Sequence, residues 1–138
     1  KAFPAPNPFP IFSKCFFLVP MQVSLLKSKL HRVTVTAVEP DYSGSITIDG
    51  QLMEAAGFLI HEKVLVGNIN NGERFETYVI PGEEGSGEIA LNGAAAHKGN
   101  IGDLLVILSF VLLDQQEAKS WEPRVVIADA ENRVRQKD

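Results

Sequence analysis

The sequence lacks most of the features that mark secreted, metal-binding and membrane-spanning proteins. It has one cysteine, Cys15, so it can form no intrachain disulfide, and it has no Cys/His zinc spacing. A single thiol fits the reducing cytoplasm. The longest apolar run, Leu104 to Leu113, is interrupted by Ser109 and is shorter than the roughly 20 residues of a spanning helix. We therefore expect a cytoplasmic protein that makes no use of a membrane.

Clustered positive charge and the common catalytic motifs are also missing. The formal net charge is −4, and the only basic run is the short tail from Arg133 to Lys137, which argues against nucleic-acid binding. The histidines, His31, His61 and His97, do not form a metal pair. No Walker phosphate loop, Gly-x-Ser-x-Gly elbow or Asp-Thr/Ser-Gly signature occurs. We therefore predict no metal site.

The first twenty residues differ in composition from the rest of the chain. Residues 1–20 contain five of the eight prolines and five of the eight phenylalanines. Proline at alternate positions blocks helix and sheet alike. Because Met21 resembles a natural start, we expect residues 1–20 to be an extension outside the fold and assign them no function. Residues 21–138 have the length of one globular domain, and the composition, with 45% hydrophobic residues, is ordinary for such a domain.

From Met21 onward the sequence indicates short strands, frequent turns and brief helices. Asp49 is a suitable N-cap for a helix over 51–56, and Gly57 is suited to end it. The pair Asn71-Gly72 is a strong hairpin signal. The expected strands cover residues 22–28, 29–37, 45–48, 63–70, 74–80, 88–91, 104–112 and 124–129. This pattern predicts a mainly β fold, a small barrel.

The stretch Ser43-Gly44-Ser45 has two interpretations. Gly-Ser is a common turn pairing, so the stretch is typical of a hairpin turn between two β segments. Alternatively, the chain cuts itself here, because Ser45 Oγ lies one residue from the Gly44 carbonyl that it would attack. The tripeptide alone favours the turn.

Several polar residues fall at the ends of the expected strands. In isolation each is an ordinary surface or half-buried strand residue. Together they supply two cations, two phenols, a hydroxyl, an amide and an imidazole, which is what a site for a small dicarboxylate needs. The residues are Lys29, His31, Tyr42, Arg74, Thr77, Tyr78 and Asn92.

Five motifs occur in one order between Met21 and about Val134. They are Lys29-Leu30-His31-Arg32-Val33-Thr34-Val35-Thr36, Tyr42-Ser43-Gly44-Ser45, Asn71-Gly72-Glu73-Arg74-Phe75-Glu76-Thr77-Tyr78, Gly85-Ser86-Gly87 and Leu91-Asn92-Gly93-Ala94-Ala95-Ala96. In register and with little length change, they resemble bacterial aspartate 1-decarboxylase.

The resemblance implies a six-stranded double-psi β-barrel that assembles as a homotetramer with active sites between subunits. It implies conversion of L-aspartate to β-alanine and carbon dioxide, which supplies pantothenate and hence coenzyme A. The cofactor would be a covalent pyruvoyl group derived from Ser45. Autocatalytic serinolysis between Gly44 and Ser45 would leave a small β chain and a larger α chain. Whether a maturation factor assists is left open.

The resemblance also implies roles for individual residues. The group derived from Ser45 would form a Schiff base with the substrate, and Tyr78 would be the proton donor. Thr77, with Asn92 in support, would stabilise the oxyanion during cleavage at Gly44. Substrate binding would involve Lys29, Arg74, Thr77, Asn92, Gly93, Ala94 and Ala95. His31 and Tyr42 would line the pocket.

The chain departs from the family pattern at three places. Val23-Ser24 stands where family members usually have Arg-Thr, Pro40 replaces a common Leu, and Gly67 stands where some members carry Trp. We expect these changes to alter rate or assembly more than the type of reaction. Two alternatives stay open: an unprocessed, non-enzymatic barrel that binds a small dicarboxylate, and a pyruvoyl decarboxylase of another amino acid.

Overall fold

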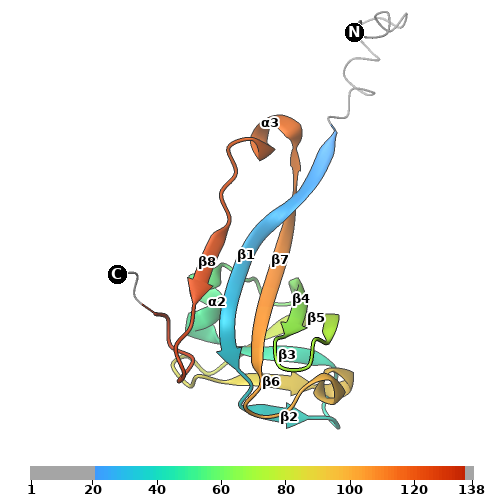
Figure 1. The fold of residues 1–138 in the computed structure, drawn as a ribbon, viewed down its shortest axis with the longest axis vertical. Coiled ribbons are helices and arrows are strands. Elements are labelled where there is room, and N and C mark those ends of the chain that lie inside the picture. Colours follow the sequence, from blue (N-terminus) through green and yellow to red (C-terminus); the bar gives the residue numbers. More distant parts are fainter. Residues whose placement is uncertain (1–20, 136–138) are drawn as a thin grey trace, which may run out of the picture.

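The computed structural model describes residues 21–135, which form a curved, mixed β-sheet around a hydrophobic core (Figure 1). The predicted extension, residues 1–20, lies outside the described residues. Within 21–135 the strands are β1 Gln22–Thr34, β2 Ala37–Glu39, β3 Ser45–Asp49, β4 Lys63–Asn68, β5 Arg74–Gly82, β6 Ile89–Asn92, β7 Leu104–Asp114 and β8 Arg124–Ile127. The helices are α2 Gly50–Ala56, the 3-10 helix η1 Gly93–Lys98 and α3 Gln115–Ala118. The predicted class, mainly β with short helices, is confirmed.

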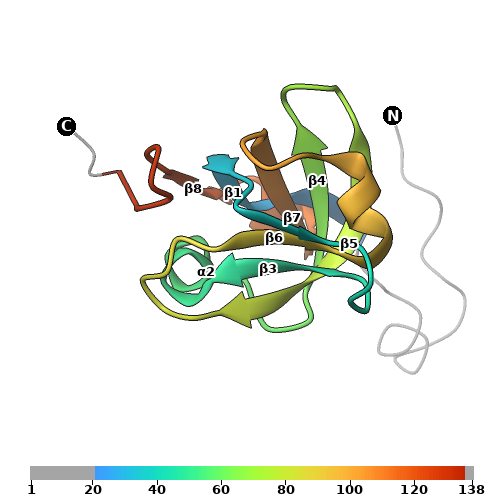
Figure 2. The ribbon, with the colours of Figure 1, turned by 90° about the horizontal axis from the view of Figure 1, so that it is seen from below.

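The strands lie in the order β2-β6-β3-β5-β4-β7-β1-β8. Three neighbouring pairs, β2–β6, β3–β5 and β1–β8, are parallel, and the other pairs are antiparallel. Figure 2 shows from below that β3 and β6 run across β4 and β7. The short strands β2 and β8 flank six central strands, and no ladder joins these two outer strands within residues 21–135. This mixed arrangement is consistent with the predicted double-psi β-barrel.

The two longest strands, β1 and β7, form an arm that rises beyond the other strands, with α3 at its end (Figure 1). The sequence predicts two strands, over residues 22–28 and 29–37, where the structure has the single strand β1 with two bulges. At the second bulge Arg32 has φ 66°, a left-handed conformation that is uncommon outside glycine.

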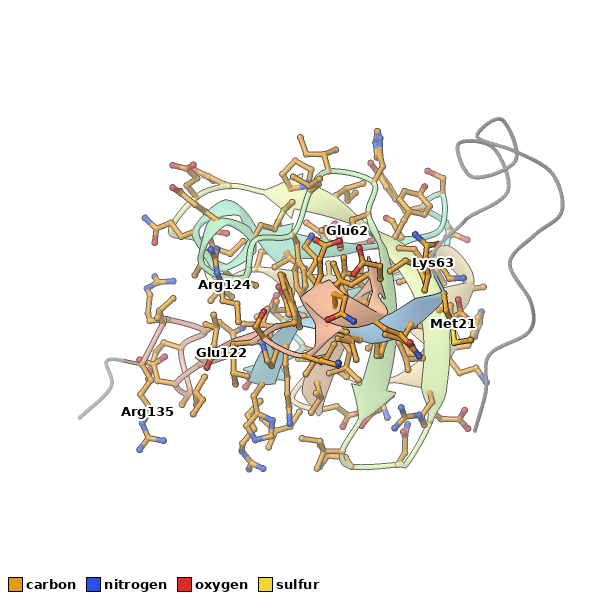
Figure 3. The ribbon with its side chains drawn as sticks, turned by 90° about the horizontal axis from the view of Figure 1, so that it is seen from above. Met21, Glu62, Lys63, Glu122, Arg124 and Arg135 are labelled. Atoms are coloured by element: carbon orange, nitrogen blue, oxygen red, sulfur yellow. The ribbon has the colours of Figure 1, made fainter. Side chains whose placement is uncertain are left out.

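A groove of about 470 Å³ at the base of the arm is lined by five apolar residues and by Ser24, Lys63 and Glu76. Exposed Phe110 and Leu112 contribute to it from β7. In the view from above, Met21 and Lys63 lie on the same side of the molecule (Figure 3).

The predicted helix caps are confirmed. The Asp49 carboxylate accepts a hydrogen bond from the Gln51 N–H at 2.8 Å, at the start of α2. Gly57 ends that helix with φ 75°, and its N–H donates to the carbonyl of Glu54. The Asp114 side chain likewise caps α3 through the N–H groups of its first turn.

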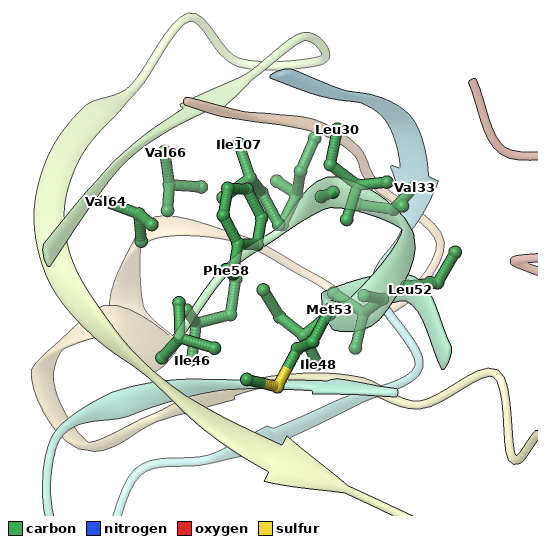
Figure 4. Close-up of a cluster of buried hydrophobic side chains, with 14 of the residues drawn as sticks. Leu30, Val33, Ile46, Ile48, Leu52, Met53, Phe58, Val64, Val66 and Ile107 are labelled. Atoms are coloured by element: carbon green, nitrogen blue, oxygen red, sulfur yellow. The ribbon is translucent and has the colours of Figure 1, made fainter. Parts of the chain in front are cut away.

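The core lies between the crossing strands and α2 (Figure 4). Alternate residues of each strand point inward, as period-two patterning requires. Among them Ile46 and Ile48 of β3, Val66 of β4 and Ile107 of β7 are fully buried. Because β3 is buried at every position, the strand that begins with Ser45 is held rigidly on both faces.

Candidate active site

The stretch around Gly44 is not the hairpin turn that the tripeptide favoured. The strands that it joins, β2 and β3, do not pair with each other, because β6 lies between them and pairs with both. The chain does reverse, through a turn closed by the Tyr42 N–H and the Glu39 carbonyl at 3.1 Å. Pro40 occupies the second position of that turn, where its fixed φ is favourable. The segment 40–44 therefore passes over the end of β6.

Ser45 is the first residue of β3 and lies directly opposite Asn92, the last residue of β6, in the antiparallel ladder. The Asn92 Nδ2 donates to Ser45 Oγ at 2.9 Å and also to Thr47 Oγ1 at 2.9 Å. Ser45 is 1% exposed and Asn92 is 3% exposed, so both bonds are shielded from water. The structure therefore places the Asn92 amide in direct contact with the Ser45 hydroxyl.

Gly93 brings the backbone of the Gly44 segment close to η1. It has φ 64°, and a Cβ atom at this position would lie 2.7 Å from Gly44 Cα and 2.9 Å from the Tyr42 carbonyl oxygen. Only glycine permits both this conformation and this approach. Gly44 itself is exposed and has no neighbour within 4 Å of an added Cβ, so the peptide bond before Ser45 is accessible on one side.

A cavity of about 170 Å³ lies at the Gly44–Ser45 bond. It brings together six of the residues predicted for the site: Gly44, Ser45, Thr77, Asn92, Ala94 and Ala95. Phe75, Glu76 and Lys98 complete the lining. Thr77 reaches it from β5, which pairs in parallel with β3. The arrangement offers a buried hydroxyl, a peptide carbonyl and two side-chain hydrogen-bond donors in one small space.

The two predicted carboxylate-binding cations, Lys29 and Arg74, lie in a different groove, of about 340 Å³. They come from β1 and β5, and neither has an acidic partner within residues 21–135. Gly67 lies in the same groove, where an added Cβ would meet the Arg74 guanidinium only at 4.0 Å. Within one chain the cations and the Ser45 cavity are therefore separate.

The remaining predicted residues do not line the Ser45 cavity either. Tyr78 follows Thr77 in β5, so alternation turns its ring to the other face, where it packs edge-on against His61 with ring centroids 6.0 Å apart. Tyr42 is 55% exposed on the 40–44 segment. Burial and the charges of Lys29 and Arg32 lower the pKa of His31, whose Nδ1 has no hydrogen-bond partner among the described residues.

Asp49 anchors the other end of β3. It is 1% exposed, and its carboxylate accepts hydrogen bonds from the N–H groups of Gly85 at 2.9 Å and Gly87 at 2.8 Å, in addition to that of Gln51. Burial raises the pKa of Asp49, but these donors and the charge of Arg133 outweigh it and leave the pKa lowered. The carboxylate therefore fastens the Gly-rich loop to the strand that carries Ser45.

Thr47, Lys98 and Asn68 are functional candidates that sequence reasoning missed. Thr47 shares the Asn92 amide, and its place two residues after Ser45 in a strand is the signal that could have identified it. Lys98 lines the cavity but lies at the far end of η1, and Asn68 acts through buried side-chain bonds that no local pattern reveals.

Within residues 21–135 no helix is long and apolar enough to cross a membrane. No group of three or more His, Cys, Asp or Glu side chains in that part of the chain is arranged to hold a metal ion.

Comparison with known proteins gives consistent relatives across the described part of the chain. Residues 21–135 match the family model described as aspartate decarboxylase. The aspartate 1-decarboxylase of Syntrophus aciditrophicus is 56% identical over 115 residues, which cover 83% of this chain and 99% of that protein. The enzymes of the same name from Cytophaga hutchinsonii and Clostridium novyi are 53% and 54% identical over 114 residues, covering 83% of this chain and 99% and 93% of theirs.

Proposed function

The chain belongs to the aspartate decarboxylase family, and from this premise we propose that it converts L-aspartate to β-alanine and carbon dioxide. The proposal includes a covalent pyruvoyl cofactor that the chain makes from Ser45. β-Alanine would then enter pantothenate and coenzyme A synthesis. We place the reaction in the cytoplasm because the chain has a single cysteine.

The observation that carries the proposal is the 2.9 Å hydrogen bond from Asn92 Nδ2 to Ser45 Oγ. It fixes the hydroxyl next to the Gly44 carbonyl, in a cavity that also contains Thr77. Because the Asn92 amide donates, the proton of Ser45 stays free for transfer as the oxygen attacks. Buried Asn92 and partly buried Thr77, which line the same cavity, are suited to stabilise a developing oxyanion, which is worth roughly 10²–10³ in rate per donor.

The proposed cleavage has three steps. Ser45 Oγ forms a bond to the Gly44 carbonyl carbon, and the amide bond breaks, which leaves an ester and a free amine on residue 45. Loss of the Cα proton then expels the Gly44 carboxylate and leaves a dehydroalanine. Addition of one water and loss of ammonia convert it to the pyruvoyl group. Gly44 suits the first step because it is exposed and carries no side chain that would obstruct attack.

The residues around Ser45 fit a pyruvoyl group at that position. When formed, the pyruvoyl carbonyl supplies an electron sink for the loss of carbon dioxide. Around it, Thr77 and Asn92 orient the substrate by hydrogen bonds, and the backbone N–H groups of Gly93, Ala94 and Ala95 approach a carboxylate closely because their side chains are small. We assign the return of a proton to the substrate carbon to Tyr78.

The carboxylate-binding part of the site is proposed to come from a neighbouring copy of the chain. Lys29 and Arg74 line a groove separate from the Ser45 cavity, so one chain alone does not present both to one small substrate. A homotetramer with active sites between subunits removes this separation. It also explains how Tyr78, His31 and Tyr42, which lie away from the cavity of their own chain, line the complete pocket.

Exposed apolar side chains support assembly. Phe110 is 48% exposed and Leu112 is 63% exposed, and both lie along the groove at the base of the arm. A two-stranded arm is marginally stable when it is unsupported, so packing of this surface against another copy would stabilise it.

The mass of the purified protein tests the proposal. We expect two fragments separated at Gly44–Ser45, and Ser45→Ala should fold normally and stay whole. Borohydride reduction with aspartate should add the substrate mass to the fragment that begins at residue 45, while glutamate in a parallel sample should add none. An intact chain would favour the non-enzymatic barrel, and trapping of glutamate alone would favour a decarboxylase of another amino acid.

A further inference from the structure

The 3-10 helix η1 touches the Gly44 segment at one end and the β4–β5 hairpin at the other. At its first residue, Gly93 packs against the backbone of Gly44 and Tyr42, with no room for a side chain. At its last residue, the Lys98 carbonyl accepts hydrogen bonds from two asparagines of the hairpin. The helix therefore connects that hairpin to the peptide bond that is proposed to break.

Asn68 is the buried member of the hairpin's contact with η1. Its side chain is 3% exposed, and Nδ2 donates to the Lys98 carbonyl at 3.2 Å and to Asp103 Oδ2 at 2.9 Å. Its Oδ1 accepts from the N–H groups of Asn70 at 2.9 Å and Asn71 at 3.3 Å. Both amide protons and both oxygen lone pairs are used, so the amide has one orientation and holds three segments together.

The other contacts at this end of η1 are exposed to solvent. Asn71 Nδ2 donates to the same Lys98 carbonyl at 3.0 Å, and Lys98 Nζ pairs with Glu73 Oε2 at 3.0 Å. The two side chains of this ion pair are 45% and 46% exposed, and exposed pairs add little. Asn68 is therefore the residue that locates the end of the helix.

We propose that Asn68 is a positioning residue that sets the placement of η1 and thereby the rate at which Ser45 attacks the Gly44 carbonyl. The inference rests on the proposed self-cleavage. Gly93 packs so closely against Gly44 that there is no room for a side chain between them. A displacement of η1 would therefore displace the reacting peptide. Misplacement of reacting groups by about 1 Å costs on the order of a hundredfold in rate.

Asn68→Asp is the sharpest test, because it keeps the size of the side chain and the acceptor for Asn70 and Asn71. It removes the donor and places a carboxylate next to Asp103. We expect the rate constant of cleavage at pH 7.5 to fall about tenfold or more, since the Lys98 carbonyl and Asp103 both lose the donor from position 68 and two carboxylates come to face each other. Asn71→Asp is the matched control, because it makes the same chemical change at an exposed position and should stay within about twofold of wild type.

The pH dependence separates positioning from a general loss of stability. In this variant the carboxylates at positions 68 and 103 lie next to each other, which raises the pKa of one of them. Protonation of that carboxylate restores a hydrogen-bond donor. The rate of Asn68→Asp relative to wild type should therefore rise as the pH falls from 7.5 to 5. The other charged or titratable groups near position 68 are Lys29, Glu73, Arg74, His97 and Lys98, and they are the same in both proteins, so the comparison at each pH isolates the change at position 68.

A second variant reverses the direction of the buried bond. In Asn68→Asp/Asp103→Asn the new amide at 103 can donate to the new carboxylate, which restores the bond between positions 68 and 103 but leaves the Lys98 carbonyl without the donor from position 68. The double variant should therefore still cleave clearly more slowly than wild type. Rates are measured by intact mass on the full chain, well below the unfolding temperature of each variant. If wild type cleaves and Asn68→Asp cleaves within twofold of it or shows no pH-dependent rescue, or if the double variant cleaves at the wild-type rate, the positioning role is refuted. A wild-type chain that never cleaves refutes the proposed function as well.

Discussion

The amide of Asn92 is shared between two hydroxyls, and removing it should slow self-cleavage far more than removing the second hydroxyl. Asn92 Nδ2 donates to Ser45 Oγ and to Thr47 Oγ1, each at 2.9 Å, in a place where Ser45 is 1% and Thr47 8% exposed. Asn92→Ala leaves both hydroxyls without this donor. Thr47→Val keeps the shape of the side chain and leaves the bond to Ser45 intact.

The expected magnitudes follow from the burial. A buried group that loses its partner costs about 1–3 kcal/mol. About 1.36 kcal/mol corresponds to a tenfold change in rate, so Asn92→Ala should reduce the rate constant of cleavage roughly 5–150-fold. Thr47→Val should reduce it no more than about threefold, because the remaining unpaired N–H of Asn92 does not touch the reacting atoms.

Cleavage is followed by intact mass after rapid purification of the unprocessed chain at low temperature, with thermal unfolding of each variant as the control for stability. The reasoning is wrong if Asn92→Ala cleaves at the wild-type rate, or if Thr47→Val is slowed as much as Asn92→Ala. The second result would mean that the amide supports β3 as a whole and has no special relation to Ser45.

Three further changes probe other parts of the molecule. The lowered pKa of Asp49 implies stability that is present above its unfolded pKa of about 3.8 and is lost as the pH falls below it. Asp49→Asn should therefore lower the free energy of unfolding at pH 7 by roughly 1–3 kcal/mol and flatten its dependence on acid pH, measured by urea titration. Ser109 Oγ is buried without a partner among the described residues, so Ser109→Ala should keep or raise the unfolding temperature, and a large fall would reveal a hidden bond. Tyr78→Phe should cleave at the normal rate yet lose most aspartate turnover, and unchanged β-alanine production would exclude Tyr78 as the proton donor.

Local patterns predicted the elements of the fold well. Asp49 and Gly57 delimit α2 because capping is a property of a few neighbouring residues. The pair Asn71-Gly72 similarly marks the turn between β4 and β5, where Gly72 has φ 76°. The bulges that keep β1 continuous were not predictable, because they depend on how β7 and β8 pair with it on both sides.

The residues of the site could be predicted from the sequence, but not which of them lie together in one cavity. Resemblance identified Ser45, Thr77 and Asn92, and the structure brings these three together in one cavity. That Lys29 and Arg74 lie in another groove depends on the sheet order, which no short pattern encodes. The hairpin interpretation of residues 43–45 was wrong for the same reason, since a strand that comes later in the chain, β6, lies between the two strands that the turn joins.

The place of the Gly44 segment has a consequence for the cleaved molecule. Residues 21–44 include β1 and β2, which are bound to β7, β8 and β6 of the other fragment and make no ladder with each other. If the chain is cut as proposed, the fold becomes an intertwined pair of fragments in which neither fragment retains a complete sheet. Separation of the fragments would then coincide with unfolding, so each cleaved subunit would unfold into two chains, and its unfolding midpoint would depend more steeply on protein concentration than that of the precursor. The new chain end at Gly44 is exposed and is free to leave the cavity while the strands behind it stay paired.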